Sequence, residues 1–185
     1  DSDFAYKGFG SSVALDGNTL AVGAPQAVTK ISLGKGDVRI FQNSGLWTQT
    51  RVISPGSEVS TNNALRYGAS LALSGGKLLI GVPGDTAGAN GTNAGAAIYF
   101  ASVSGAPTKT WVGAEQDGVY GTSVALGSAG AFIGGPYRES RAGFIEYYTF
   151  ANLNALNYRI VSLNRAVNDA FGWSIAVSGN NVMAG

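Results

Sequence analysis

The segment FGSSVALDGNTLAVGAP, residues 9–25, recurs three more times in this chain, and the repetition decides the fold. The further copies are YGASLALSGGKLLIGVP (67–83), YGTSVALGSAGAFIGGP (120–136) and FGWSIAVSGNNVMAG (171–185). They align without gaps and start 58, 53 and 51 residues apart. Each copy has an aromatic-Gly-x-Ser start, an alternating apolar run, a turn containing glycine and a second apolar run. Self-similarity at such a period is typical of tandem-repeat proteins.

Each copy predicts a β-hairpin, because apolar residues alternate with small ones on both sides of a turn. A third strand is predicted after each variable loop, at residues 36–41, 95–100 and 143–150. A fourth, more polar strand follows each of these and carries Trp47, Trp111 and Tyr158 in turn. One unit is therefore a four-stranded antiparallel meander, which buries both faces only by stacking on its neighbours. Four-stranded sheets repeated radially form a β-propeller.

The sequence thus predicts an all-β fold and a single repeat domain over residues 1–185. Its predicted repeats span residues 9–66, 67–119 and 120–170, followed by the first hairpin of a fourth at 171–185. A closed propeller has typically about four to eight blades, so three and a half blades do not close a ring. We expect either a segment cropped from a longer protein or copies that complete one another in a ring or filament, as part of a larger propeller, array or assembly.

Composition excludes several classes of function. The net charge is +1 and the charged residues, 12% of the chain, are scattered, so nucleic-acid binding is not expected. Apolar runs are short and broken by glycine, which predicts no membrane span. The chain has no cysteine and no histidine, and it therefore lacks disulfides, thiolate metal sites and the commonest general base. These features predict a protein that is not an enzyme.

The Phe-Gly and Gly-Ala-Pro ends of residues 9–25, with Tyr67-Gly68 to Pro83 and Tyr120-Gly121 to Pro136, resemble the FG-GAP repeat. This family builds the propeller of integrin α-subunits and occurs in many secreted or surface bacterial and algal proteins. The resemblance implies a β-propeller of the FG-GAP type. It also implies an extracellular, secreted or cell-surface location and a role such as adhesion.

One departure from the family concerns calcium. In the integrin-like version the first hairpin turn is often a DxDxDG loop whose carboxylates bind Ca²⁺. Here the turn holds one carboxylate, Asp16, and the other copies hold none. We therefore expect no metal at these turns and no cofactor.

Strand direction places the loops between strands two and three, and those between one repeat and the next, on the same face. These loops vary in length and carry most of the charge, and variable loops on a rigid scaffold commonly bind ligands. The alternative is that they are solvated connections. The residues chosen as a candidate binding face are Lys30, Lys35, Arg66, Asp85, Glu115, Asp117, Arg138, Glu139, Arg141 and Asp169.

Three further features have two interpretations each. Asn90, in the sequence Asn-Gly-Thr, is a candidate glycan acceptor, although this motif is also frequent by chance. The aromatic residues either stack on sugars or, as we favour, fill the space between sheets; they are Trp47, Tyr99, Trp111, Tyr147, Tyr148 and Tyr158. The carboxylates Asp117 and Asp169, which precede the aromatic-Gly start, are expected to accept backbone hydrogen bonds.

The function that follows is a non-enzymatic extracellular interaction or structural module that binds protein or glycan through the loop-rich face. The alternative is a self-assembling structural subunit of an extracellular filament or surface layer. In that case the open β edge is completed by neighbouring chains as a homo-oligomer or fibre. A hydrolase using the paired carboxylates Glu115 and Asp117 is the least favoured reading, since no motif supports it.

Overall fold

In the computed structural model, the described residues are 8–27, 35–60, 65–86 and 91–185. They form three four-stranded antiparallel sheets and one two-stranded sheet, in chain order. The first sheet contains β1 (Ser12–Asp16), β2 (Thr19–Ala24), β3 (Asp37–Asn43) and β4 (Trp47–Ile53). The second contains β5 (Ser70–Ser74), β6 (Lys77–Val82), β7 (Ala96–Phe100) and β8 (Lys109–Val112).

The third sheet contains β9 (Val124–Leu126), β10 (Gly130–Gly134), β11 (Ile145–Thr149) and β12 (Tyr158–Ile160). The fourth sheet is the hairpin of β13 (Ile175–Ser178) and β14 (Asn181–Ala184). One short segment in the described ranges, α1 (Arg138–Arg141), is assigned as helix. The prediction of an all-β fold built from four-stranded antiparallel sheets is confirmed.

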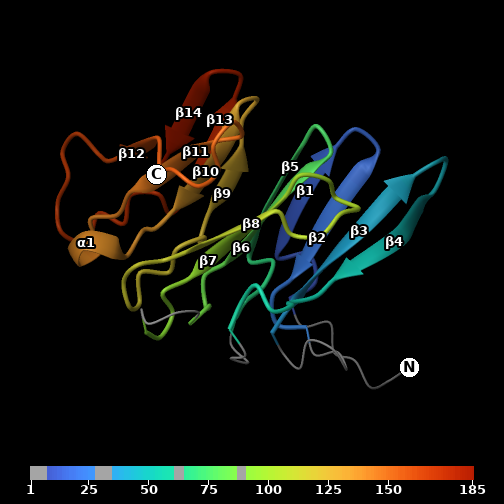
Figure 1. The fold of residues 1–185 in the computed structure, drawn as a ribbon, viewed down its shortest axis with the longest axis horizontal. Coiled ribbons are helices and arrows are strands. Elements are labelled where there is room, and N and C mark those ends of the chain that lie inside the picture. The colour runs from blue at the N-terminus through green and yellow to red at the C-terminus, as the bar shows by residue number, and fades with distance from the viewer. Residues whose placement is uncertain (1–7, 28–34, 61–64, 87–90) are drawn as a thin grey trace.

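The sheets follow one another side by side, from β1–β4 to the hairpin of β13 and β14 (Figure 1). The first strand of every sheet lies at a common hollow of about 310 Å³. Small and aliphatic side chains of β1, β5, β9 and β13 line this hollow. The sheets are therefore arranged as propeller blades are around an axis.

The serine of the aromatic-Gly-x-Ser start joins each sheet to the next. Its hydroxyl donates a hydrogen bond to the carbonyl of the motif glycine one repeat further on. The three bonds are Ser12 to Gly68 (2.6 Å), Ser70 to Gly121 (2.9 Å) and Ser123 to Gly172 (2.7 Å). We call this set of contacts, with the glycine described next, the repeat joint.

Close approach of two backbones explains the glycine at the end of each second strand. A Cβ at Gly23, Gly81 or Gly134 would clash with the same carbonyl oxygen that accepts the serine hydrogen bond. In addition, the N–H of the aromatic residue donates to a carbonyl of the preceding repeat, as from Tyr67 to Lys35 at 2.9 Å and from Tyr120 to Ala94 at 3.1 Å. The repeated sequence motif is thus largely a motif for joining neighbouring sheets.

Two different cores fill the spaces between the first three sheets. The interface of the first and second sheets is mainly aliphatic and is built from Val38, Ile40, Ile53, Leu78, Ile80, Ile98 and Phe100. The interface of the second and third sheets is rich in aromatic residues, namely Tyr99, Trp111, Tyr120, Phe144 and Tyr148. The interpretation of the aromatic residues as inter-sheet filling is confirmed for Tyr99, Trp111 and Tyr148.

Two of the other aromatic residues do not follow that interpretation. Trp47 is 45% exposed and Tyr158 is 68% exposed. Trp47 begins β4, the outer strand of the first sheet, and Tyr158 begins β12, the outer strand of the third. A position on an outer strand does not by itself expose a side chain, because Trp111 on the outer strand β8 is buried against Tyr148 of the third sheet.

Candidate binding face

The two rims of the stacked sheets differ in kind. Tight hairpin turns lie at one rim, toward the top of Figure 1, while α1 lies at the other. At the tight-turn rim the N–H of Gly76 donates to the Asp16 carboxylate at 3.0 Å, so neighbouring turns support each other. Of the predicted binding residues, Arg138, Glu139 and Arg141 lie in α1 on the second rim.

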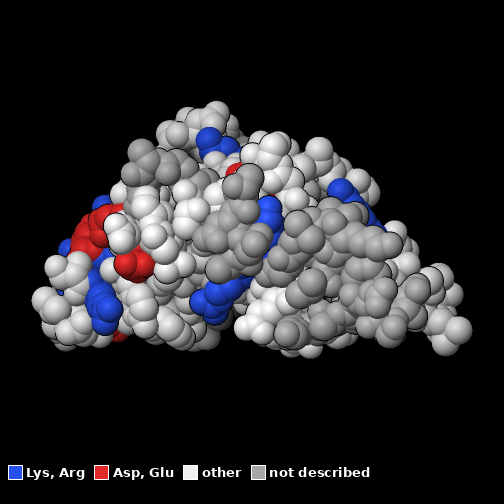
Figure 2. Space-filling model, turned by 90° about the horizontal axis from the view of Figure 1, so that it is seen from below, with Lys and Arg blue, Asp and Glu red and all other residues white. Residues whose placement is uncertain are grey.

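The structure brings three of the predicted residues together at α1. The Arg138 guanidinium lies 3.6 Å from the Glu115 carboxylate, which also accepts the N–H of Glu139 at 3.0 Å. Glu139 in turn pairs with Arg159 at 3.0 Å and with Arg165. We call these five residues the rim ion cluster. Acidic and basic side chains are intermingled at one end of the rim in Figure 2.

The backbone inside this cluster is strained. Glu139, Ser140 and Arg141 have φ values of +52°, +60° and +63°, although none of them is glycine. A left-handed conformation costs a non-glycine residue about 1–2 kcal/mol. The ion pairs of Glu115, Arg159 and Arg165 hold the turn in place from strand β12 and from two neighbouring loops. Strain that the surroundings maintain in this way is more frequent at functional sites than elsewhere.

Beside the strained turn lies a short stack of three side chains. The rings of Trp173 and Tyr137 are 5.5 Å apart, and the Arg141 guanidinium lies 5.0 Å from the centre of the Tyr137 ring. Trp173 is 51% exposed. Its position in the motif holds small residues in the other repeats, namely Ser11, Ala69 and Thr122. Trp173 was not among the predicted binding residues, although this departure from the repeat could have identified it.

Several predicted residues lie apart from this cluster and have local structural partners. Asp85 is buried, and its carboxylate accepts the N–H of Ser60 at 2.9 Å. Lys35 contributes its backbone carbonyl to the joint with Tyr67, and Arg66 is an exposed residue with a φ of +58°. Lys30 and the candidate glycan acceptor Asn90 lie outside the described residues.

The carboxylates before the aromatic-Gly start behave differently from each other. Asp169 accepts the N–H of Ala166 at 2.6 Å, which confirms the predicted backbone hydrogen bond. Asp117 accepts the side-chain amide of Asn93 at 3.1 Å instead. Glu115 and Asp117, the carboxylate pair considered for a hydrolase, therefore both bond to neighbouring loop residues. In the described part of the chain, no three acidic side chains are grouped so as to hold a metal ion.

A buried carboxylate that the sequence analysis did not identify lies beneath the rim. Glu146 on β11 accepts hydrogen bonds from the hydroxyls of Tyr120 and Tyr148, each at 2.8 Å, and pairs with Arg159 at 2.7 Å. Burial, with the Glu146 charge second, raises the pKa of Tyr148 to about 12 and the pKa of Tyr120 well above its usual value. Arg159 therefore connects the rim ion cluster to the core.

Comparison with known families identifies the repeat. Residues 3–41 match the family model described as the FG-GAP repeat. A search of curated proteins finds no significant match. FG-GAP repeats are typical of extracellular or surface proteins and suggest a β-propeller interaction module, and the family is generally non-enzymatic. Among the helices of the described residues, none is long and apolar enough to cross a membrane. Residues 3–41 are thus similar to the FG-GAP repeat, and the four-stranded antiparallel sheets of the described residues are consistent with blades of that type.

Proposed function

We propose that this protein is an extracellular, non-enzymatic interaction module that binds a partner protein or glycan through the loop-rich rim of its third sheet. The observation that carries the proposal is the stack of Trp173, Tyr137 and Arg141 beside a strained turn. An exposed tryptophan costs solubility and adds nothing to the joint between repeats, since the other repeats form that joint with small residues. Contact with a partner would give this exposed tryptophan a role.

The chemistry of the stack suits a ligand with both apolar and polar groups. The exposed ring face of Trp173 offers an apolar platform, on which sugar rings or peptide side chains pack. The nearby Arg141 guanidinium supplies hydrogen-bond donors at the edge of that platform. Because the rim ion cluster fixes the turn that carries Arg141, the platform is preorganised and loses little conformational entropy on binding.

Replacement of Trp173 by alanine tests this proposal. We expect binding of the labelled protein to an array of neutral and acidic oligosaccharides, or to immobilised extracellular matrix, to weaken about tenfold or more, the usual cost of losing an aromatic anchor. Leu46→Ala is the matched control, since Leu46 is 80% exposed and belongs to the first sheet's β3–β4 turn. Equal binding by Trp173→Ala and the unaltered protein would refute a role for this rim position.

The extracellular location has a separate test at Asn90. Secretion through a eukaryotic pathway would allow a glycan at this asparagine, because the sequence Asn-Gly-Thr is an acceptor motif. The intact mass of the native protein, before and after enzymatic removal of glycans, gives the answer. A mass shift that Asn90→Gln abolishes would support a secreted glycoprotein.

A second candidate function is self-assembly into an extracellular filament or surface layer, in which neighbouring chains complete one another's open β edges. The observation in its favour is the apolar surface that is exposed at the fourth sheet, the hairpin of β13 and β14. The exposed apolar residues Trp173 and Met183 lie in or beside this hairpin. Sedimentation velocity over a hundredfold range of concentration tests the idea, and a concentration-independent monomer would contradict it.

A further inference from the structure

The interface of the first and second sheets contains a pocket of about 250 Å³. Its apolar part includes Ile53, the last residue of β4, Phe100, the last residue of β7, and Pro107 from the loop before β8. Ile53 and Phe100 are both buried. Its charged side chains are Arg51 and Glu58. The pocket therefore combines buried apolar surface with two groups of opposite charge.

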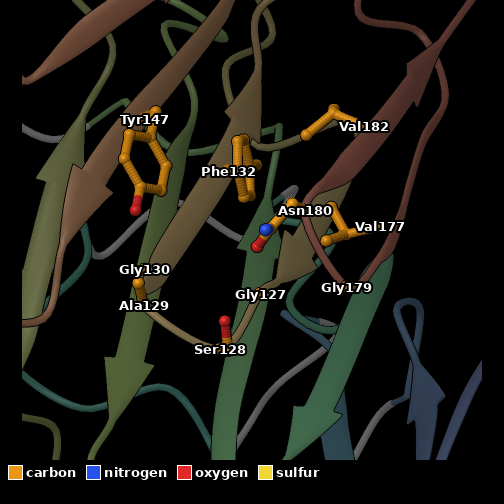
Figure 3. Close-up of a pocket in the computed structure, with 10 residues that line it drawn as sticks. All are labelled: Gly127, Ser128, Ala129, Gly130, Phe132, Tyr147, Val177, Gly179, Asn180 and Val182. Atoms are coloured by element: carbon orange, nitrogen blue, oxygen red, sulfur yellow. The ribbon is translucent and has the colours of Figure 1, made fainter.

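This pocket differs from the hollow between the third and fourth sheets. Figure 3 shows that hollow, of about 150 Å³, with Phe132 and Tyr147 on one side and Val177 and Val182 on the other. The described residues that line it include no charged side chain. Ligand sites typically combine apolar walls with a few polar groups that orient the ligand. Of the two spaces, the pocket between the first and second sheets has that combination.

Strand register shows which side chain fills the equivalent space at the next interface. Ile53 and Trp111 are equivalent, because each pairs with the second residue after the glycine that precedes the third strand. By the same alignment, Phe100 is equivalent to Tyr148. The indole ring of Trp111 packs on Tyr148, with 4.8 Å between the ring centres. The first sheet has isoleucine where the second has tryptophan, and the pocket lies where that ring is missing.

The outer strand also makes a polar contact with the next sheet at both interfaces. Trp111 Nε1 donates to the carbonyl of Leu153, in the loop between β11 and β12, at 3.1 Å. In the first sheet the Arg51 guanidinium donates to the carbonyl of Val103, in the loop between β7 and β8, at 2.6 Å. The hydrogen bond of the indole thus has a counterpart at the first interface, whereas its ring has none.

The charged groups of the pocket have hydrogen-bonding capacity left for a ligand. Glu58 Oε1 accepts the N–H of Gly56 at 3.0 Å, and the carboxylate accepts no other hydrogen bond among the described residues. The Arg51 guanidinium uses one of its nitrogens for Val103 and has further N–H donors. An aromatic ring with an N–H or O–H group at its edge therefore finds an acceptor in Glu58. Its π face attracts the Arg51 cation.

We propose that this pocket binds a single neutral aromatic ring that carries an N–H or O–H group, of which indole is the simplest example. The ring packs on Phe100, its N–H donates to Glu58, and its π face lies against the Arg51 guanidinium. The contact of Trp111 with Tyr148 is the precedent within this protein. The ring belongs either to a free small molecule or to a side chain of a polypeptide. This site is independent of the functions proposed above.

Titration of the full chain with indole, followed by NMR of the backbone amides, tests the proposal. We expect saturable one-to-one binding with shifts centred on the pocket. Ile53→Trp fills the pocket with an indole ring of its own and is expected to remove that binding, while Leu46→Ala, in the exposed turn between β3 and β4, leaves it unchanged. Glu58→Gln is expected to lower several-fold the preference for indole over benzothiophene, which has a similar shape but no N–H.

The outcomes decide both the site and the source of the ring. Absence of saturable indole binding, or binding that persists in Ile53→Trp, would overturn the site. An unchanged preference for indole in Glu58→Gln would overturn the proposed hydrogen bond, and this variant keeps the test decisive if Ile53→Trp does not fold. N-acetyl-tryptophanamide separates the sources. Binding as tight as that of indole supports a polypeptide side chain, whereas binding of indole alone supports a free small molecule.

Discussion

The interface of the first and second sheets and that of the second and third use the same repeat joint but different fillings. Both have the serine hydroxyl bonded to a glycine carbonyl of the next repeat. The first is then filled by aliphatic side chains such as Ile80 and Ile98, whereas the second contains aromatic rings around the Glu146 carboxylate. The comparison shows that the same joint accommodates either filling.

The motif tyrosines Tyr67 and Tyr120 show the difference most directly. Both are fully or almost fully buried at equivalent positions of successive repeats. The Tyr120 hydroxyl donates to Glu146, while the Tyr67 hydroxyl has no hydrogen-bond partner among the described residues. Ile98 in the second sheet occupies the position that Glu146 occupies in the third, as their pairing with Ile80 and Ile133 shows. The hydroxyl of the motif tyrosine therefore makes a hydrogen bond in the third repeat segment, at Tyr120, but not in the second, at Tyr67.

The largest effect is expected from the shared joint. Gly23→Ala and Gly81→Ala each place a methyl group against a backbone carbonyl and a serine hydroxyl, which cannot both move aside. We expect each to lower the free energy of unfolding by at least about 3 kcal/mol, the upper range for overpacking. Chemical denaturation measures the loss. Gly105→Ala is the control, because the atom nearest to its added methyl group would be 3.4 Å away. If only one of Gly23→Ala and Gly81→Ala lowers the stability, the two interfaces are not joined in the same way.

The second prediction concerns the filling of the aromatic interface. Glu146→Ala leaves the hydroxyls of Tyr120 and Tyr148 and the Arg159 guanidinium without their partner, and we expect a loss of about 3 kcal/mol. Ile98→Ala, at the equivalent position, is expected to cost about as much through an empty cavity.

A double-mutant cycle separates these two causes. Much of the loss from Glu146→Ala should disappear in a background where Tyr120 and Tyr148 are phenylalanine, because no hydroxyl is then left unsatisfied. The loss from Ile98→Ala should be the same in a Tyr67→Phe background. Additive effects at Glu146 would show that its hydrogen bonds do not stabilise this interface.

The third prediction compares the two motif tyrosines themselves. Tyr120→Phe removes a hydrogen bond to a buried carboxylate and is expected to cost about 1–2 kcal/mol. Tyr67→Phe removes a hydroxyl that has no described partner, so we expect little change or a slight gain in stability. The first and fourth repeats already carry phenylalanine here, at Phe9 and Phe171. Thermal unfolding of both variants is sufficient, and a larger loss from Tyr67→Phe would reverse the comparison.

The smallest effect is a difference in alkaline stability. Because burial raises the pKa values of Tyr120 and Tyr148, both stay neutral above pH 10, where tyrosines of the unfolded chain ionise. Unfolding then releases protons, so the free energy of unfolding falls as the pH rises from about 10, by about 1.4 kcal/mol per pH unit for each group. For Tyr148 the fall ends near its folded pKa of about 12. The urea midpoint of unfolding should fall less between pH 9 and pH 11 in Tyr148→Phe than in the unaltered protein.

The fold was predictable from sequence because the repeat copies align without gaps and each contains the alternation of a hairpin. The role of the repeated serine was not predictable, since its partner carbonyl lies 49 to 56 residues away in the next repeat. A hydroxyl at a strand start is compatible with many local hydrogen bonds, and only the stacking of sheets selects this one.

The candidate site was predictable in outline but not in its details. The loop analysis placed Glu115, Arg138 and Glu139 on one rim, and the structure pairs them. It did not identify Glu146, although the alternation of Phe144, Glu146 and Tyr148 puts this carboxylate on the side of two aromatic residues. A charged residue in a strand is ordinarily taken to face solvent, and the compensating hydroxyls of Tyr120 and Tyr148 are visible only in three dimensions.

The repeat joint has a consequence for how such a chain changes in length. Because every joint is made by the same few backbone atoms and one hydroxyl, duplication of a gene segment encoding one repeat creates two correct junctions at once. The side chains between the sheets are then free to diverge from aliphatic to aromatic without altering the junction. Growth and loss of repeats by unequal recombination therefore preserve the joint itself, and only the side chains that fill each new interface need to adjust.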